Sequence, residues 1–167
     1  VDVALVEGAV SNVENEHLAR LIRKNARFVV SFGSFGTYGL SPEGKVLWER
    51  QLGKMETRLG WGESVTPALH GGKAYLAYDH EGPSFLACLD AATGKTLWQV
   101  PRDEPCTWST PAVVESGGKT LVLLNGTKRV RALDASNGKE LWTLPGLTVN
   151  AIPSPIVRDG VAYFMAG

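Results

Sequence analysis

The pattern of apolar and polar positions changes its period near residue 33. Apolar residues dominate 1–8 and 27–33, as in strands that are buried on both faces of a sheet. Between them, 13–26 carries apolar residues at i, i+3 and i+4 with charged residues mostly opposite, which predicts an amphipathic helix. Strand, helix and strand form one βαβ unit of a parallel sheet. Such a unit does not make a domain by itself.

From residue 36 the chain is built from short strands that repeat. LDAATGKTLW (89–98) recurs as LDASNGKELW (133–142), and LSPEGKVLW (40–48) is a shorter version. The terminal tryptophans, Trp48, Trp98 and Trp142, follow one another at intervals of 50 and 44 residues. A second motif places Pro67, Pro111 and Pro155 at intervals of 44 and 44 residues. Repeats of 40–50 residues made of short strands are typical of a β-propeller.

The repeats divide the chain into blades, the small sheets from which a propeller is made. We predict a partial blade over 36–52, full blades over 64–100 and 109–144, and the beginning of another over 153–167. The predicted fold is therefore mainly β: an incomplete propeller of about three four-stranded blades, preceded by a short βαβ segment over 1–33.

Each repeat contains residues suited to a tight turn followed by a large packing anchor. Glycine at the turn tolerates a positive φ, aspartate binds nearby backbone N–H groups, and tryptophan buries a large ring between blades. The structural residues predicted on this basis are Gly44, Trp48, Asp90, Gly94, Trp98, Asp134, Gly138 and Trp142.

The repeats resemble the quinoprotein-like (PQQ-like) β-propeller family, whose hallmark is a tryptophan-docking repeat of the form L-D-A-x-T-G-K-x-x-W. Residues 89–98 match it closely, and 133–142 differ by Asn137 in place of threonine. Residues 40–48 depart further, with Ser41 and Pro42 in place of Asp-Ala and one residue fewer. The family includes quinone-dependent dehydrogenases, an outer-membrane assembly scaffold and many binding modules. The resemblance implies a periplasmic or extracellular parent protein.

The segment 1–33 resembles a different family, the nickel–iron hydrogenase small subunit and its quinone-oxidoreductase relatives. In that family a VEGAV turn and a later GSC line the proximal iron–sulfur cluster, and the matching positions here are Glu7, Gly8 and Phe35. Phenylalanine cannot ligate iron, so we do not expect a complete cluster. We hypothesise that the chain is a chimera of two unrelated fragments joined near 32–34.

Composition narrows the range of partners. Seventeen basic residues balance seventeen acidic ones, so nothing indicates nucleic-acid binding. No apolar run is long enough to span a bilayer, and the missing start Met suggests a truncated N-terminus. The two cysteines, Cys88 and Cys106, form no CxxC motif, and Cys88 is expected to be a small buried hydrophobe.

Four residues just before the predicted inner strands are candidates for a ligand-facing rim, namely Trp61, Glu63, Trp108 and Asn150. Loops at this position face ligands in propellers; the alternative is that both tryptophans pack between blades. The cluster Asp79-His80-Glu81 is interpreted as a solvated hairpin turn, because a metal would need further ligands. No catalytic or metal site is predicted.

We therefore expect a non-catalytic PQQ-like propeller fragment that binds or scaffolds a protein partner. The alternatives are a fragment of a PQQ-dependent dehydrogenase or of an iron–sulfur electron-transfer subunit of a hydrogenase. No cofactor is expected in the fragment, whereas PQQ with calcium belongs to the parent enzyme under the first alternative. The expected partner is another protein or the remaining blades of the propeller. The isolated chain should be inactive, and its open propeller edges should favour self-association.

Overall fold

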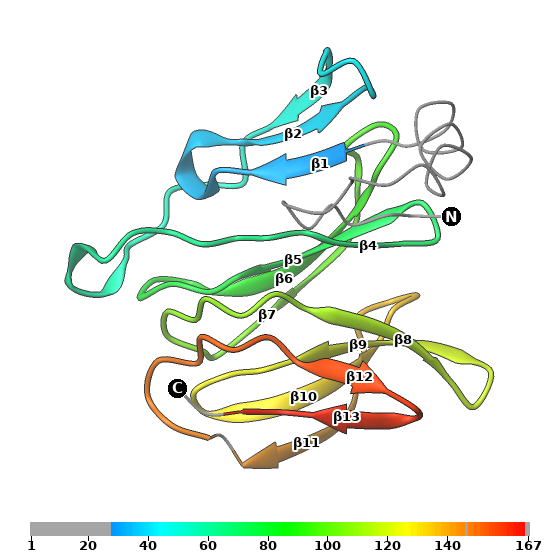
Figure 1. Cartoon of the computed structure of the whole chain (residues 1–167). Helices are drawn as coiled ribbons and strands as arrows, with labels where there is room; N and C mark the ends of the chain where they lie inside the picture. Colours follow the sequence, from blue (N-terminus) through cyan, green and yellow to red (C-terminus); the bar gives the residue numbers. More distant parts are fainter. Residues whose placement is uncertain (1–27, 146, 166–167) are drawn as a thin grey trace, which may run out of the picture.

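A computed structural model describes residues 28–145 and 147–165, which form four antiparallel sheets side by side (Figure 1). Blade 1 has β1 (Phe28–Ser31), β2 (Thr37–Leu40) and β3 (Val46–Arg50). Blade 2 has β4 (Ala68–His70), β5 (Lys73–Tyr78), β6 (Phe85–Asp90) and β7 (Thr96–Pro101). Blade 3 has β8 (Ala112–Ser116), β9 (Lys119–Leu124), β10 (Arg129–Asp134) and β11 (Glu140–Pro145). Blade 4 has β12 (Ile156–Arg158) and β13 (Val161–Tyr163).

The sheets confirm the predicted mainly β fold and incomplete propeller. Blades 2 and 3 are four-stranded, with the strands in chain order across each sheet. Their inner strands begin one residue after Pro67 and Pro111, and β12 begins one residue after Pro155. Proline cannot donate a backbone hydrogen bond, so it stands where pairing has not yet begun.

The strand predicted over 27–33 belongs to the propeller rather than to a parallel βαβ unit. Phe28–Ser31 pair antiparallel with Thr37–Leu40, so blade 1 starts eight residues earlier than the predicted boundary at 36. The short connection through a 3-10 turn, Gly33–Phe35, explains the pairing, because a tight connection joins antiparallel neighbours whereas parallel strands need a long crossover. The first strand and the helix of the predicted βαβ unit lie outside the described residues.

The repeated turns join the third and fourth strand positions of blades 1 to 3. Gly44, Gly94 and Gly138 have φ of 80°, 70° and 74°, in the region that glycine adopts most easily. Asp90 Oδ1 accepts the Thr93 N–H at 2.8 Å, and Asp134 Oδ1 accepts the Ser136 N–H at the same distance. The Ser136 hydroxyl also donates to Asp134 and lowers the pKa of its carboxyl. The aspartates therefore hold these turns in shape.

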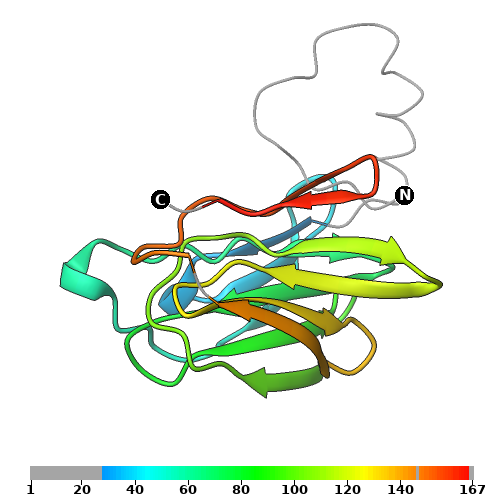
Figure 2. The same cartoon turned by 90° about the horizontal axis from the view of Figure 1, so that it is seen from below.

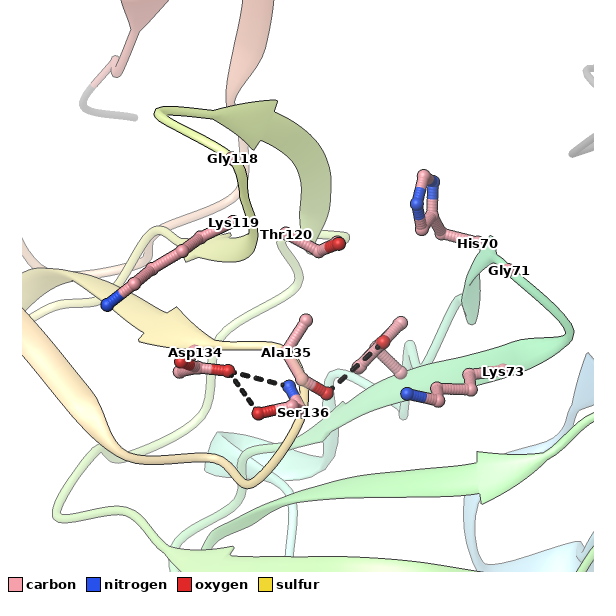
Figure 3. Close-up of a pocket in the computed structure, with 10 residues that line it drawn as sticks. His70, Gly71, Lys73, Gly118, Lys119, Thr120, Asp134, Ala135 and Ser136 are labelled. Carbon is pink, nitrogen blue, oxygen red and sulfur yellow. Dashed lines mark hydrogen bonds between the residues drawn. The ribbon is translucent and has the colours of Figure 1, made fainter.

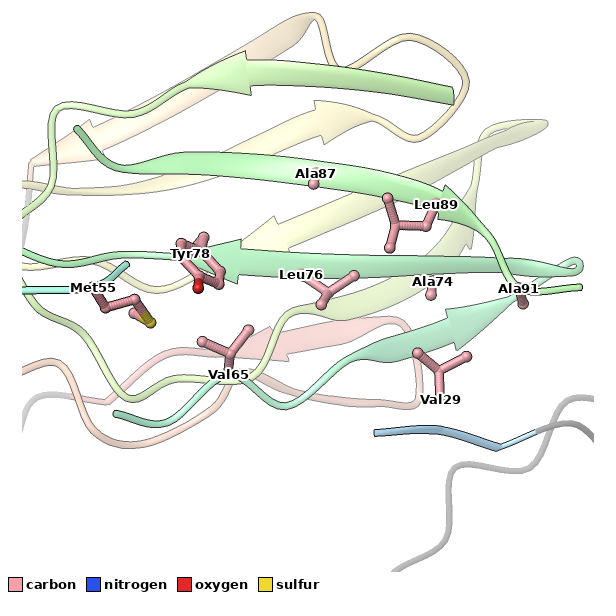
Figure 4. Packing of buried hydrophobic residues seen from close by; sticks show 9 residues of the cluster. All are labelled: Val29, Met55, Val65, Ala74, Leu76, Tyr78, Ala87, Leu89 and Ala91. Carbon is pink, nitrogen blue, oxygen red and sulfur yellow. The ribbon is translucent and has the colours of Figure 1, made fainter. Parts of the chain in front are cut away.

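The hydrophobic core lies between blades, because both faces of the central strands are buried. Ala74, Leu76 and Tyr78 of β5 pack toward blade 1, against Val29 and other residues shown in Figure 4. Tyr75 and Ala77, which alternate with them, pack toward blade 3. Successive side chains of a strand point to opposite faces, so one apolar strand serves two interblade cores.

Two of the repeat tryptophans extend into the next blade. Trp48 Nε1 donates to the Ala91 carbonyl at 3.1 Å, and Trp98 Nε1 donates to the Ala135 carbonyl at 3.2 Å. A Cβ on Gly94 would lie 2.5 Å from the Trp48 ring. Gly94 and Gly138 therefore each serve twice, by adopting a positive φ and by leaving room for an indole of the preceding blade.

Both cysteines are free and buried, and we expect neither thiol to react in the native protein. Burial raises the pKa of Cys88 to about 11, and it also raises the pKa of Cys106, whose thiol contacts Arg58 and Glu56. A thiolate is the reactive form, and it is scarce at neutral pH when the pKa is raised. Titration with Ellman's reagent should give no fast thiol in buffer and two thiols in guanidinium chloride. A fast thiol in buffer would contradict this burial.

Candidate functional site

The two ends of the blades differ, and the candidate residues gather at one of them. Short glycine turns close one end, here called the turn face. The other end, called the loop face and seen on the left of Figures 1 and 2, includes the longest connections among the described residues, 51–67 and 102–111. The loop face comprises 32–36, 51–67, 79–84, 102–111, 125–128 and 147–155. Connections of this kind vary in sequence without disturbing the sheets, and they commonly carry binding residues.

The structure brings three of the four predicted rim residues together. The rings of Trp61 and Trp108 lie with centroids 6.0 Å apart, and Trp108 Nε1 donates to the Gly62 carbonyl at 3.3 Å. Asn150, with φ of 67°, accepts from the Arg58 guanidinium at 3.4 Å. The backbone N–H of Trp108 also donates to the Ala151 carbonyl, which connects the loops of three successive blades.

The fourth predicted residue, Glu63, fastens a neighbouring loop. Its carboxylate accepts from the Ser34 N–H at 2.5 Å and from the Ser34 hydroxyl at 2.6 Å. The same hydroxyl accepts the Met55 N–H at 2.7 Å. Ser34 lies in the connection between β1 and β2, between Phe32 and Phe35 in the sequence. By binding Ser34, Glu63 therefore holds the backbone that carries these two phenylalanines. Both of its oxygens are therefore engaged in structure.

Exposed apolar side chains surround these fixed groups. Phe35 is 77% exposed, Leu59 79% and Trp61 56%, and Phe32 is also exposed. Phe32 and Phe35 line a groove of about 440 Å³, which Gly62 and Glu63 also line. Leu59 holds an unusual φ of 51° at the tip of the 3-10 turn Arg58–Gly60. Exposed aromatic and aliphatic residues of this kind are common where proteins bind their partners.

A buried ion pair supports the loop face from within. Asp79 accepts from Arg102 Nε at 2.6 Å and Nη2 at 2.9 Å, and from the Thr107 hydroxyl at 2.6 Å. The side chains of the pair have almost no exposed surface. Burial alone would lower the pKa of Arg102, but the adjacent Asp79 carboxylate outweighs it and the pKa is raised. Arg102 is therefore charged in the folded protein, and both Asp79 oxygens accept from its guanidinium.

The interpretation of Asp79-His80-Glu81 as a solvated turn is wrong for its first two residues. Asp79 and His80 are buried, because the connections 51–67 and 102–111 cover the turn. His80 Nδ1 accepts the Glu56 N–H at 3.1 Å and the Gly82 N–H at 3.2 Å, while Nε2 lies 3.2 Å from the Pro83 carbonyl. This set of partners fits a neutral ring with its proton on Nε2.

A second hollow lies on the turn face, between blades 2 and 3, with a volume of about 350 Å³ (Figure 3). Lys73 and Lys119 line it, but much of its polar lining is already bonded within the fold. The Tyr75 hydroxyl donates to the Ala135 carbonyl at 3.3 Å, and Asp134 binds Ser136. We therefore interpret this hollow as a junction between repeats and regard the loop face as the stronger candidate for a binding site.

The described residues do not fit a calcium–quinone site. Such a site needs carboxylate and amide oxygens that converge on the cation. The oxygens of Glu63 are taken by Ser34, and the Asn150 amide oxygen accepts from Arg58, whose positive charge would repel calcium. No three His, Cys, Asp or Glu residues within 28–145 and 147–165 come together as metal ligands would. We therefore derive no chemistry through a quinone.

Sequence reasoning missed Phe32, Phe35 and Leu59. Their apolar character is evident from the sequence. Isolated apolar residues in loops form no regular hydrophobic pattern, however, so the sequence does not show whether their side chains are buried or exposed. Phe35 stood out only as the residue in the position of a cluster cysteine. Its exposure follows from the 3-10 turn Gly33–Phe35, which the sequence did not predict.

The fold and its repeats define a β-propeller of the PQQ-like class. Residues 36–167 match the family described as outer membrane protein assembly factor BamB, and the chain belongs to this family.

Comparison with solved structures gives the same fold. BamB from Moraxella catarrhalis has a TM-score of 0.64 and 21% identity, over 83% of this chain and 43% of that chain. The quinohemoprotein alcohol dehydrogenase ADHIIG from Pseudomonas putida HK5 has a TM-score of 0.51 and 22% identity, over 71% of this chain and 19% of that chain. The chain thus spans less than half the length of either protein.

A short similarity to a hydrogenase also exists. One of the subunits of the F420-non-reducing hydrogenase from Methanothermobacter thermautotrophicus is 38% identical over 50 residues, which are 30% of this chain and 16% of the hydrogenase chain. In the part of the chain that the structure describes, no helix has the length and apolar character needed to cross a membrane.

Proposed function

We propose that the chain is a non-catalytic propeller module that binds an apolar segment of a protein partner through its loop face. The observation that carries this proposal is the exposure of Phe32, Phe35, Leu59 and Trp61 on two connections that Glu63 and Ser34 tie together. Fixed aromatic side chains contribute much contact area at little entropic cost, which is why they dominate protein interfaces.

The polar groups around this cluster support binding rather than catalysis. Each of the predicted polar rim residues has a structural partner, Ser34 for Glu63 and Arg58 for Asn150. They hold the connections in place while the apolar side chains face outward. The family description names an outer membrane assembly factor, and on that ground we propose a location outside the cytoplasm for this chain as well.

Site-specific photo-crosslinking in cells that make the protein tests the partner. A photoreactive phenylalanine analogue at position 35 should give a discrete crosslinked protein, and Trp61→Ser should abolish it by removing part of the apolar surface. The matched control carries the analogue in place of the exposed Lys139, in the turn between β10 and β11 on the turn face. Equal crosslinking from both positions, or a product that Trp61→Ser leaves unchanged, would count against the loop face.

Calorimetric titration with PQQ and calcium distinguishes the proposed binding module from a fragment of a PQQ-dependent dehydrogenase. We expect no heat of binding, because the oxygens of Glu63 and Asn150 are occupied. Saturable binding that Glu63→Gln removes would favour a fragment of a quinone-dependent dehydrogenase and would overturn the proposed function.

A further inference from the structure

The buried His80 lies where the connection 51–67 rests on the loop between β5 and β6. Its Nδ1 accepts two backbone N–H groups, that of Glu56 in the connection at 3.1 Å and that of Gly82 in its own loop at 3.2 Å. The Glu56 carbonyl in turn accepts the N–H of Glu81 at 2.9 Å. The connection is therefore docked on this loop by hydrogen bonds that meet beside the imidazole ring.

The imidazole is packed closely on the side of its own loop. The Ser84 hydroxyl accepts the His80 N–H at 2.9 Å, and the Pro83 carbonyl lies 3.2 Å from ring Nε2. A Cβ on Gly82 would lie 2.7 Å from ring Cε1, and the ring of Tyr78 meets the imidazole edge-on with centroids 6.0 Å apart. The ring is therefore held in place, whereas the connection that it binds lies at the surface.

A proton on Nδ1 would turn the contact with the connection from attraction into repulsion. The contact of Nε2 with the Pro83 carbonyl requires a proton on Nε2, so a second proton has to go to Nδ1. A charged imidazole has two N–H donors and no acceptor, so the N–H groups of Glu56 and Gly82 would then face another N–H. Because a buried N–H without an acceptor is unfavourable, the charged ring favours a connection that has moved away.

Charged groups surround His80 on each of the three segments packed together here. Asp79 is paired with Arg102, and the Glu104 carboxylate accepts two backbone N–H groups. Burial raises the pKa of Tyr78 to about 12, so its hydroxyl stays neutral. None of the remaining charged groups is a hydrogen-bond partner of the ring in the described part of the chain; they are Lys54, Glu56, Arg58, Glu63, Glu81 and Asp103. The two N–H groups at Nδ1 therefore decide what a proton does.

We propose that protonation of His80 releases the connection 51–67 and thereby weakens binding at the loop face. The connection carries Leu59 and Trp61, two of the exposed apolar residues to which we assign binding, so this inference rests on the proposed function. The docked connection binds one proton fewer than the released one, so docking weakens as the pH falls, by at most about tenfold per pH unit. Histidine is the side chain that ordinarily changes its charge between about pH 5 and pH 8.

Cys106 reports on the release directly, because the connection covers it. Its thiol accepts the Arg58 N–H at 3.2 Å and lies 3.6 Å from the Glu56 carbonyl. The full chain is labelled with dithiodipyridine at about pH 7.5 and about pH 5, and each rate is divided by that of the same chain in guanidinium chloride at the same pH. We expect the protection of Cys106 to fall at least about tenfold at the lower pH. Cys88, which is buried between blades 2 and 3, should stay protected.

His80→Asn is the decisive variant, because an asparagine amide oxygen can accept the same two N–H groups and takes up no proton. Cys106 should then stay protected at both pH values, and thermal unfolding verifies that the variant is folded. His70→Gln and His17→Gln are the matched controls, since His70 contacts Glu115 on the turn face and His17 lies outside the described residues. Both should respond to pH as the unaltered chain does.

The unaltered chain provides a second measurement if His80→Asn does not fold. The logarithm of the Cys106 protection should change with pH at a slope of no more than about one, because a single proton is taken up. A steeper slope would indicate general unfolding by acid and would overturn the proposal. Protection that does not change with pH, or that changes equally in His80→Asn, would overturn it as well.

Photo-crosslinking from position 35 in permeabilised cells at the same two pH values connects the release to binding. We expect the crosslinked product to fall at least about fivefold at about pH 5 in the otherwise unaltered chain and to persist in the chain that also carries His80→Asn. A product that persists while Cys106 becomes labelled would show that the release does not control binding. No product at either pH would count against the proposed function, whereas the labelling of Cys106 would still decide whether the connection is released.

Discussion

Replacing Asp79 by alanine is expected to destabilise the protein by about 3–5 kcal/mol, because it leaves the buried Arg102 charge without its partner. Three hydrogen bonds converge on the Asp79 carboxylate, two from Arg102 and one from Thr107. A buried charge that loses its counter-ion keeps the whole cost of leaving water. Urea unfolding followed by tryptophan fluorescence measures the change.

Asp103 is the matched control for Asp79. It also binds arginine, through Arg129 and Arg131, but its own side chain is half exposed. Burial alone would raise the pKa of Asp103, but the nearby Arg131 outweighs it and the pKa is lowered. The contribution of this carboxyl to stability is therefore present at neutral pH and is lost as the pH falls through its folded pKa. Asp103→Ala should cost no more than about 1 kcal/mol.

Thr107→Val keeps the Asp79 test informative even if Asp79→Ala does not fold. It removes one hydrogen bond to the carboxylate and leaves the ion pair intact, so the expected loss is about 1.5–3 kcal/mol. Equal effects from Asp79→Ala and Asp103→Ala would show that the buried pair has no special role.

Trp98→Ala is expected to destabilise the protein by about 3 kcal/mol, whereas Trp142→Ala at a low protein concentration should have little effect. The two residues occupy the same position in successive repeats. Trp98 packs between blades and donates to the Ala135 carbonyl, whereas Trp142 is 40% exposed within the described part of the chain. The comparison isolates interblade packing from the local propensity of the strand. Urea unfolding of both variants measures it, and equal losses would refute the difference.

Much of the fold could be predicted from the repeats, because the residues that set the period also build the contacts. The glycine of each repeat needs a positive φ, and the aspartate beside it binds the turn, so the pattern LDAxxGKxxW encodes its geometry locally. The start of blade 1 could not be predicted, since an apolar strand at 28–31 fits a parallel or an antiparallel sheet equally well.

The site was only partly predictable, because its parts come from connections far apart in the sequence. Trp61 and Trp108 could be found as aromatic residues before an inner strand, but their contact depends on how blades 2 and 3 are placed. The burial of Asp79 depends on Arg102 and Thr107, which no local pattern connects to it. The chimera stays a hypothesis, since most of 1–33 lies outside the described residues and the hydrogenase match covers 50 residues.

The unequal ends of the blades have a consequence for how such a protein diversifies. On the turn face, Gly94 and Gly138 lie against a tryptophan of the preceding blade, so an inserted residue in either turn would disturb two blades at once. On the loop face, the connections 51–67 and 102–111 differ in length although they join equivalent strands. Mutation can therefore lengthen, shorten or exchange these segments while the repeats persist, and new specificities can evolve on an old scaffold without a loss of folding.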